Sequence, residues 1–461
     1  MEEIILQKAR QMVARVREKV LGEGFSVEKC IPELMKITNE TALDVYKVLI
    51  EQADQAIREA KKERKEQGLI VERVGDTRKI VTSMGELTYN RSYYQNKETG
   101  QFEYPVDHLM GIDVYERVDP GLAKGLVACA RTQSYRKSSK SKCDGALSAQ
   151  TVMNKIRKSE PEIKPVEKCK VAVLHIDADE DHVAVQHGKR KKSTEVPLVS
   201  VYEGIEKIGQ RGVCKNIFHI SEYGKKPDEL WEEVLSRIEE RYDLEGTRIY
   251  LHGDGAGWIK AGLEWLPNSV FVLDSYHKNK YIMALTAGCS DDEKKMLRRA
   301  LKQAMEEEDA DYFQKTIQYV LDHYPERTED IQAAADYLLS HIKGVSIRKQ
   351  EPEAKNGGAT EPHISHVLSS RLSSRPKGWS KATLEHFVPI LAAGDDVKLI
   401  RRSTSKSLSP VEEKVVSKAK RKSSSGIRSE VKPLFLQRGK QDSWYDLFHG
   451  ILYEAAQVPL Q

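Results

Sequence analysis

Apolar residues recur at three- and four-residue steps through the first part of the chain, which is the period of an amphipathic helix. The repeat includes Ile4, Ile5, Ala9, Met12, Val13, Val16 and Val20. A second run extends from Thr41 to Ala53 and continues into a charged stretch at residues 58–65. We therefore expect a helical region over residues 1–67. Its charged face fits a solvated dimerisation or interaction surface better than direct contact with DNA.

The hydrophobic period shortens after residue 68. Short alternating segments at 69–71, 79–82 and 87–94 are separated by glycine-containing turn signals. This pattern predicts a small antiparallel β region over residues 68–118. Its arginines and tyrosines could contact nucleic acid, although cross-strand packing explains them equally well.

Helical spacing returns over residues 119–165, with three short helices expected. Ser148 is a good N-cap for the third of them. The start of that helix carries two amides, a hydroxyl and a base: Gln150, Thr151, Asn154 and Lys155. A helix-turn-helix presents such side chains to the major groove of DNA. These four are candidate DNA-binding residues, and a plain three-helix spacer is the alternative.

The remaining pattern predicts a mixed α/β core. Apolar runs at 171–185, 196–202, 212–220, 248–253 and 269–274 suit strands, and a helical pattern at 230–238 lies between the third and fourth. Residues 166–287 would form the first part of this core, 288–350 an all-helical insertion, and 351–396 the last part. Residues 397–461 are basic and rich in serine, as expected of a solvated or phosphate-binding tail.

Composition narrows the class of protein. The chain has 461 residues, of which 31% are charged, and a net charge of +4, so several soluble domains are expected. None of the six cysteines forms a C-x-x-C pair, which argues against a zinc ribbon or a disulfide framework and favours a reducing cytoplasm. No secretory signal or membrane-spanning run is apparent, so a cytoplasmic, nucleoid-associated protein is expected.

Three acids lie on separate predicted elements of the core. Asp179 lies in the first strand, Asp254 follows a later strand between Gly253 and Gly255, and Glu361 begins a helix after the insertion. Carboxylates that converge from separate elements can hold two Mg²⁺ ions for phosphodiester cleavage or strand transfer. The order of these acids matches an RNase H-like core.

The first strand offers three acids on the same face, because side chains alternate along a strand. Asp177, Asp179 and Asp181 all satisfy that condition, so geometry alone leaves the choice open. A phosphatase of the haloacid dehalogenase type is a different class of enzyme that also uses acids after strands. It would need a further acid shortly after Asp254, where this chain has Ala-Gly-Trp, so the sequence argues against that class.

Longer motifs carry a family resemblance. They are Asp179-Glu180-Asp181-His182-Val183, His252-Gly253-Asp254-Gly255-Ala256, Leu273-Asp274-Ser275-Tyr276-His277 and the stretch from Glu361 to Ser369, followed by Arg371 and Gly378-Trp379. Together they resemble bacterial insertion-sequence transposases of the ISLre type, which are related to Mutator-like DDE transposases. The resemblance implies a catalytic, metal-binding triad of Asp179, Asp254 and Glu361. It also implies a Mg²⁺ cofactor replaceable by Mn²⁺, and it favours Asp179 as the first acid. Pro362 departs from the family pattern, in which glycine is more common at this position.

Other residues near these motifs are possible accessories. Asp274 and His277 could line the site, while His363 and His366 could bind phosphate or, with His277, zinc. Arg371 and Arg375 could place positive charge beside a DNA backbone. The expected partners are transposon-end DNA and target DNA, bound by a homodimer or higher oligomer. A catalytically silent DNA-binding derivative and a nuclease that only hydrolyses are the alternative functions.

Overall fold

The computed structural model describes residues 2–21, 26–162, 165–187, 190–375, 377–394 and 399–401. The chain divides into two units, with the boundary between Leu122 and Ala123. The three-helix region expected at 119–165 therefore falls almost wholly in the second unit, together with the α/β core.

The first unit combines a helical hairpin with a three-stranded antiparallel sheet of order β1-β2-β3. Its elements are α1 (Glu2–Leu21), α2 (Val27–Glu59), α3 (Lys61–Glu66), β1 (Leu69–Thr82), β2 (Gly85–Asn96), β3 (Phe102–Glu103) and α4 (Pro105–Leu109). Leu43 and Ile50 of α2 pack on Leu87 of the sheet. Arg91 and Tyr89 both contact the buried carboxylate of Asp107. At these positions the arginine and tyrosine of the sheet serve internal packing.

Three short helices open the second unit, as the sequence predicts: α5 (Pro120–Ala130), α6 (Tyr135–Cys143) and α7 (Ala149–Arg157). The turn between α6 and α7 begins with Asp144 and Gly145, both at positive φ. The Ser148 hydroxyl accepts a hydrogen bond from the backbone N–H of Thr151 at 3.1 Å, so the expected N-cap is confirmed. The segment after α7 forms a short strand, β4 (Ser159–Pro161), which pairs with β14 (Leu399–Arg401).

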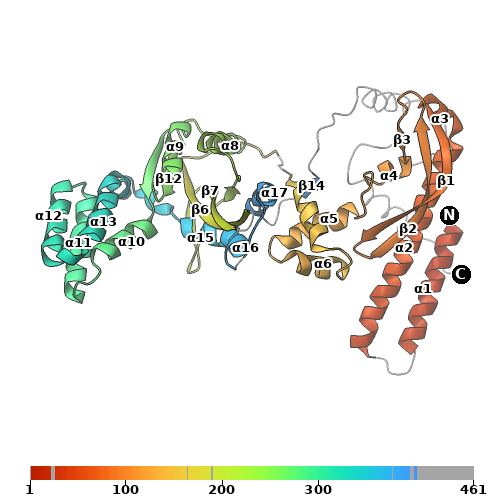
Figure 1. Ribbon diagram of the computed structural model, residues 1–461, viewed down its shortest axis with the longest axis horizontal. Helices are drawn as coiled ribbons and strands as arrows, with labels where there is room; N and C mark the ends of the chain where they lie inside the picture. Colours follow the sequence, from red (N-terminus) through yellow and green to blue (C-terminus); the bar gives the residue numbers. More distant parts are fainter. Residues whose placement is uncertain are drawn as a thin grey trace. The chain divides into compact units, whose positions relative to one another are not determined.

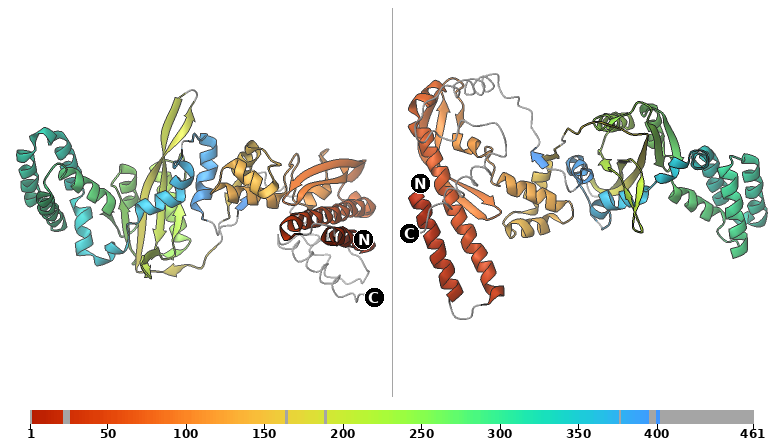
Figure 2. Two further views of the ribbon diagram at one scale, coloured as in Figure 1. Left: turned by 90° about the horizontal axis from the view of Figure 1, so that it is seen from below. Right: turned by 180° about the vertical axis from the view of Figure 1, so that it is seen from behind.

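The core of the second unit is a five-stranded mixed sheet of order β10-β7-β6-β12-β13. Its strands are β6 (Val173–His187), β7 (Arg190–Tyr202), β10 (Phe218–Ile220), β12 (Arg248–Gly253) and β13 (Ser269–Leu273). β12 runs parallel to both β6 and β13, whereas β7 is antiparallel to β6 and to β10. The β6–β7 pair continues beyond its contact with β12 as a long hairpin (Figure 2).

Helices cover both faces of this sheet (Figure 1). Leu174, Ile176 and Ala178 pack against α8 (Pro227–Glu239) and α9 (Gly257–Trp265). The alternate residues of β6, His175 through Asp181, face the other side. That face is covered by α14 (Ile342–Gln350) and by the helical segment that carries Glu361. The acids of β6 therefore lie beneath the last part of the core.

A run of helices follows β13 and begins at Ser275, before the 288–350 range predicted for the helical insertion. They are α10 (Ser275–Leu285), α11 (Asp291–Glu306), α12 (Ala310–His323), the short η1 (Pro325–Arg327), α13 (Thr328–Ser340) and α14. Leu297, Leu301, Phe313, Ile331 and Leu338 belong to one buried cluster. That cluster also includes Leu273 of β13, so the insertion and the sheet share a core.

Glu361 belongs to a helical run that changes its pitch. The short η2 (Pro352–Asn356) precedes α15 (Thr360–Ile364), which continues as the π-helical η3 (Ser365–Ser369) and α16 (Ser370–Leu372); α17 (Lys381–Ala392) follows. The N-cap of α15 is Ala359, which makes no side-chain hydrogen bond. Single π-turns of this kind are frequent at functional sites.

The stretch 212–220 differs from the single strand that its apolar pattern predicts. It divides into β9 (Arg211–Cys214), which pairs with β8 (Ile205–Ile208), and β10 of the core sheet. Asn216 lies between them at φ +51°, a conformation that interrupts a strand.

No helix among the described residues is long and apolar enough to cross a membrane.

Candidate active site

The strand register brings Asp179 and Asp254 to the same place. His252 of β12 lies opposite Asp177 of β6, so two further residues along the parallel strands place Asp254 beside Asp179. Gly253 permits the close approach, because a β-carbon there would lie 2.9 Å from the carbonyl oxygen of Ala178. The two acids predicted from strand ends are therefore neighbours.

The turn after β12 holds Asp254 through its backbone and its side chain. The backbone N–H of Ala256 donates to Asp254 Oδ1 at 2.8 Å. Gly255 has a φ of +89°, which side-chain-bearing residues rarely adopt. The Tyr337 hydroxyl, from the helical insertion, donates to the Asp254 carbonyl oxygen at 2.5 Å. The turn is thus fixed from two sides.

Electrostatics link all three predicted acids. Burial and the negative charges of Glu180, Glu361 and Asp254 together raise the pKa of Asp179 to about 7, against the opposing hydrogen bond from the Glu180 backbone N–H. A carboxyl that resists ionisation beside other carboxyls is typical of a site built to receive a cation. The structure therefore brings Asp179, Asp254 and Glu361 into one electrostatic neighbourhood.

Asp177 has a different environment from Asp179. Its carboxylate, buried in the core, accepts hydrogen bonds from the Tyr202 hydroxyl and the backbone N–H groups of Gly358 and Ala359, at 2.8 to 3.2 Å. His363 Nδ1 lies 3.3 Å from Asp177 Oδ2. Burial opposes the charge of Asp177, but these donors hold its pKa below the usual value. Its lone pairs are occupied, and it anchors the loop that precedes Glu361.

Asp181, the third acid on this strand face, lies farther along the hairpin. It is buried and accepts a hydrogen bond from the Ser373 hydroxyl at 2.8 Å. The structure thus separates three aspartates that are equivalent in the sequence pattern, and the charges of both Asp254 and Glu361 act on Asp179.

The chemistry of the site suits a hard cation. Carboxylate oxygens are the ligands that Mg²⁺ and Mn²⁺ prefer. Asp179 carries a destabilised charge that a cation would stabilise. Within the described residues, however, no three His, Cys, Asp or Glu side chains are grouped closely enough to hold a metal ion. The acids are neighbours, but they do not form a closed coordination shell.

Asp274 and His277 form an ion pair next to the acids. His277 Nδ1 lies 2.8 Å from Asp274 Oδ2, and the His277 backbone N–H also donates to Asp274. The hydrogen bond with Asp274 raises the pKa of His277, and the charges of Asp254 and Asp179 act in the same direction. Asp274 is also the N-cap of α10.

The histidines after Glu361 have separate surroundings. His363 is half-buried beside Asp177, with Nε2 3.6 Å from Cys214 Sγ and its ring 5.5 Å from that of His219. His366 is exposed. His363 therefore contacts Asp177, the residue that anchors the loop before Glu361. Among the described residues, His363 and His366 are not grouped with His277 as a zinc site would require.

Arg371 requires a correction. It was expected to lie beside DNA, but it is buried, and its guanidinium lies over Trp379, Phe387 and Tyr135 at 4.8, 5.3 and 5.5 Å. Its Nε donates to the Ala130 carbonyl oxygen at 2.7 Å. Arg371 therefore joins α16 to α5 and α6 and is unavailable to DNA. Arg375 is exposed, as DNA contact would require.

The candidate recognition helix α7 exposes only some of the residues expected to bind DNA. Gln150 and Asn154 are exposed one turn apart, joined by a 3.2 Å hydrogen bond, and Thr151 is half-buried. Lys155 is buried, so its assignment to DNA contact is corrected. At the C-terminal end of the helix, Arg157 donates to Ser380 and Thr383, which attaches α7 to α17.

Several residues near the acids were not identified from the sequence. Glu180 accepts a hydrogen bond from Trp258 Nε1 at 2.8 Å, and its pKa is raised by burial and by Asp254. Tyr337 and His341 reach the Asp254 turn from the insertion. Glu180 belongs to a motif that carries the family resemblance, but no local signal indicates Tyr337 or His341.

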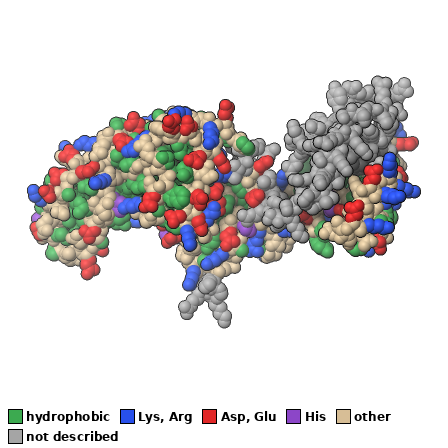
Figure 3. All heavy atoms as spheres, turned by 90° about the horizontal axis from the view of Figure 1, so that it is seen from above, with side chains coloured by type: hydrophobic (Ala, Val, Ile, Leu, Met, Phe, Trp, Pro, Cys, Tyr) green, Lys and Arg blue, Asp and Glu red, His purple; other side chains and the backbone are tan. Residues whose placement is uncertain are grey.

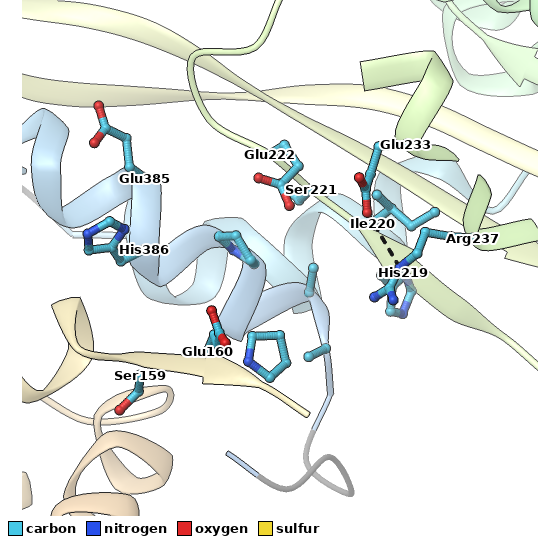
Figure 4. Close-up of a pocket in the computed structure, with 14 residues that line it drawn as sticks. Ser159, Glu160, His219, Ile220, Ser221, Glu222, Glu233, Arg237, Glu385 and His386 are labelled. Atoms are coloured by element: carbon cyan, nitrogen blue, oxygen red, sulfur yellow. Dashed lines mark ion pairs between the residues drawn. The ribbon is translucent and has the colours of Figure 1, made fainter. Parts of the chain in front are cut away.

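A cavity of about 360 Å³ lies elsewhere in the second unit, between β10, α8, α17 and β4 (Figure 4). Glu233 and Arg237 of α8 form an ion pair at its wall, 3.7 Å apart. None of the three acids lines it. On the face shown in Figure 3, acidic and basic side chains of the described residues are interspersed, and neither sign forms a continuous field.

Comparison with known proteins places the chain in a family. Residues 20–406 match UPF0236, described as an uncharacterised protein family. A UPF0236 protein of Caldanaerobacter subterraneus subsp. tengcongensis is 36% identical over 394 residues, covering 83% of this chain and 82% of the relative. Another from the same organism is 37% identical over 395 residues, covering 83% and 82%, and its name joins eleven loci. Many copies in one genome are typical of proteins associated with mobile elements. The chain belongs to the UPF0236 family.

Proposed function

We propose that this protein is a DDE transposase of an insertion sequence, with an RNase H-like catalytic core. The observation that carries the proposal is the charge environment of Asp179, which responds to both Asp254 and Glu361. These residues come from two strands and from a helix that follows the insertion. The sheet order β10-β7-β6-β12-β13, with the second strand antiparallel, supports the same core.

The residues have distinct roles in this proposal. Asp179, Asp254 and Glu361 would hold the divalent ions, Mg²⁺ or Mn²⁺. Such ions, when bound, activate the attacking oxygen and stabilise the leaving oxygen of a phosphodiester. Asp177 holds the loop before Glu361 in place. His277, with its raised pKa, offers a positive charge to a phosphate near the acids.

DNA recognition is proposed for the three-helix region. Gln150 and Asn154 are exposed on α7 and are of the type that reads adenine in the major groove. Exposed Arg136, Lys137 and Lys140 on α6 would contact phosphates. Relatives that occur at many loci of one genome also suit an element that copies or moves itself. The partners would be transposon-end and target DNA, bound by a dimer or higher oligomer.

The test is an end-cleavage and strand-transfer assay with purified protein, Mg²⁺ and duplexes that carry the ends of its own element. Cleavage followed by joining to a target plasmid is expected. Cleavage without joining would favour a hydrolytic nuclease, and end binding without cleavage would favour a silent derivative.

Two substitutions identify the acids in that assay. Asp254→Asn and Glu361→Gln should abolish cutting and leave DNA binding intact, because each removes a charge from the proposed metal site and keeps the side-chain shape. Glu385→Gln is the matched control, since Glu385 is exposed on α17 at the separate cavity. Retained cutting by either acid variant would contradict the assigned triad.

A further inference from the structure

The helical insertion reaches the central acid through one aromatic group. Tyr337 of α13 donates its hydroxyl to the Asp254 carbonyl oxygen at 2.5 Å. Its ring stacks on Tyr281 of α10, with centroids 3.8 Å apart. Burial and the charges of Asp254 and Asp274 raise the pKa of Tyr337, so the hydroxyl remains a donor at any physiological pH.

His341, at the junction of α13 and α14, closes on the same turn. It is buried, and its Nδ1 lies 2.8 Å from the Tyr337 carbonyl oxygen. A carbonyl accepts only from a protonated nitrogen, so Nδ1 carries the proton. The opposite nitrogen, Nε2, has no hydrogen-bond partner among the described residues. It faces Gly255, where an added β-carbon would overlap it.

These contacts enclose the whole turn. Gly253 abuts Ala178 of β6, the Asp254 carbonyl is held by Tyr337, and Gly255 lies against the His341 ring. The insertion is therefore more than a peripheral appendage, because its α13 supplies one wall of the turn that presents Asp254.

We propose that the helical insertion positions Asp254 through Tyr337 and His341. Both are positioning residues that act through the backbone of the turn. The proposal rests on the proposed function only in treating Asp254 as a metal ligand, since the contacts themselves do not depend on it.

Tyr337→Phe tests the hydroxyl while keeping the ring stack. Tyr324→Phe is the matched control, because it removes a 3.1 Å hydrogen bond to Glu293 in the same insertion without touching the turn. Amide hydrogen exchange is measured on a peptide covering residues 251–258 of the full-length protein without DNA. Tyr337→Phe should accelerate exchange there by about fivefold to tenfold, the worth of one lost hydrogen bond, and Tyr324→Phe should not.

The second measurement is the Mg²⁺ concentration that gives half-maximal cleavage. Tyr337→Phe should raise it by about threefold to tenfold, as expected if a ligand is less well positioned, with the control unchanged. Unchanged exchange in Tyr337→Phe would overturn the proposal. Accelerated exchange in a protein whose wild type never cuts DNA would leave the positioning role intact and refute the proposed function instead.

Gly255→Ala tests the His341 wall. In the wild-type background the new methyl group meets the imidazole, and exchange of the same peptide should rise steeply. In a His341→Ala background, the additional effect of Gly255→Ala should be at least threefold smaller, leaving only the cost of the positive φ. Equal effects in both backgrounds would show that His341 does not constrain the turn.

Discussion

Replacing Asp179 by asparagine should stabilise the metal-free protein, although the same change should abolish activity. The pKa of Asp179 is raised from 3.8 to about 7, a shift of about three units. At 1.36 kcal/mol per pKa unit, ionising this carboxyl in the folded state at pH 8 costs up to about 4 kcal/mol. Relaxation of the site reduces this, so we expect a gain of about 1–3 kcal/mol in the free energy of unfolding of Asp179→Asn.

The difference in the free energy of unfolding between Asp179→Asn and the wild type depends on pH. Below about pH 3, Asp179 is mostly neutral in both the folded and unfolded states, so its substitution should change little. As pH rises from about 4 to 7, the unfolded chain ionises while the folded carboxyl stays protonated, and wild-type stability is lost. The advantage of Asp179→Asn should therefore grow over this window and level off above it.

Urea unfolding at pH 3.5, 5.5 and 8, with EDTA or with Mg²⁺, measures the effect. Asp177→Asn is the control, because the Asp177 carboxylate accepts from Tyr202, Gly358 and Ala359 and its pKa is lowered. That variant should be less stable at pH 8, by about 1–3 kcal/mol. Saturating Mg²⁺ should stabilise the wild type and not Asp179→Asn. Destabilisation by Asp179→Asn in EDTA at pH 8 would refute the reasoning.

Three further outcomes are expected. Because a cation must displace the proton of Asp179, Mg²⁺ affinity measured by calorimetry should rise about tenfold per pH unit below 7 and flatten above it, and a flat profile would contradict this. Gln150→Ala and Asn154→Ala should each weaken binding to the element's own ends by about 1–3 kcal/mol in mobility shifts, and equal losses on unrelated DNA would argue against base reading. Arg371→Lys should lower the free energy of unfolding by about 2–3 kcal/mol, through loss of a buried donor and its aromatic contacts. Urea unfolding measures this loss. In the same experiment, substitution of the exposed Arg375 by lysine should leave the free energy of unfolding within about 0.5 kcal/mol of wild type.

Local pattern was sufficient for most elements. The three-helix region, the strands β6, β12 and β13 and the helices of the insertion follow hydrophobic periods of 3.6 or 2, which short-range geometry imposes. The Ser148 cap follows from the chemistry of a single residue. The division of 212–220 into two strands was not predictable, because it depends on Asn216 adopting a positive φ and on separate pairing partners.

Identifying the candidate site required both the sequence pattern and the tertiary structure. Residue type and position in predicted elements singled out Asp254, Glu361 and an aspartate of the first strand, and the family resemblance favoured Asp179. They could not distinguish Asp179 from Asp177, since alternation places both on one strand face. That distinction comes from long-range partners: the backbone N–H groups of Gly358 and Ala359 donate to Asp177, while the charges of Asp254 and Glu361 act on Asp179.

Tertiary structure also decided the roles of two basic residues and of two residues in the helical insertion. Arg371 and Lys155 look like surface cations in the sequence and lie inside the fold. Tyr337 and His341 look like ordinary helical residues and lie against the Asp254 turn. Sequence pattern specifies which residues can do chemistry and which element carries them. Only contacts between segments distant in the chain decide which charges meet, which are neutralised and which face solvent.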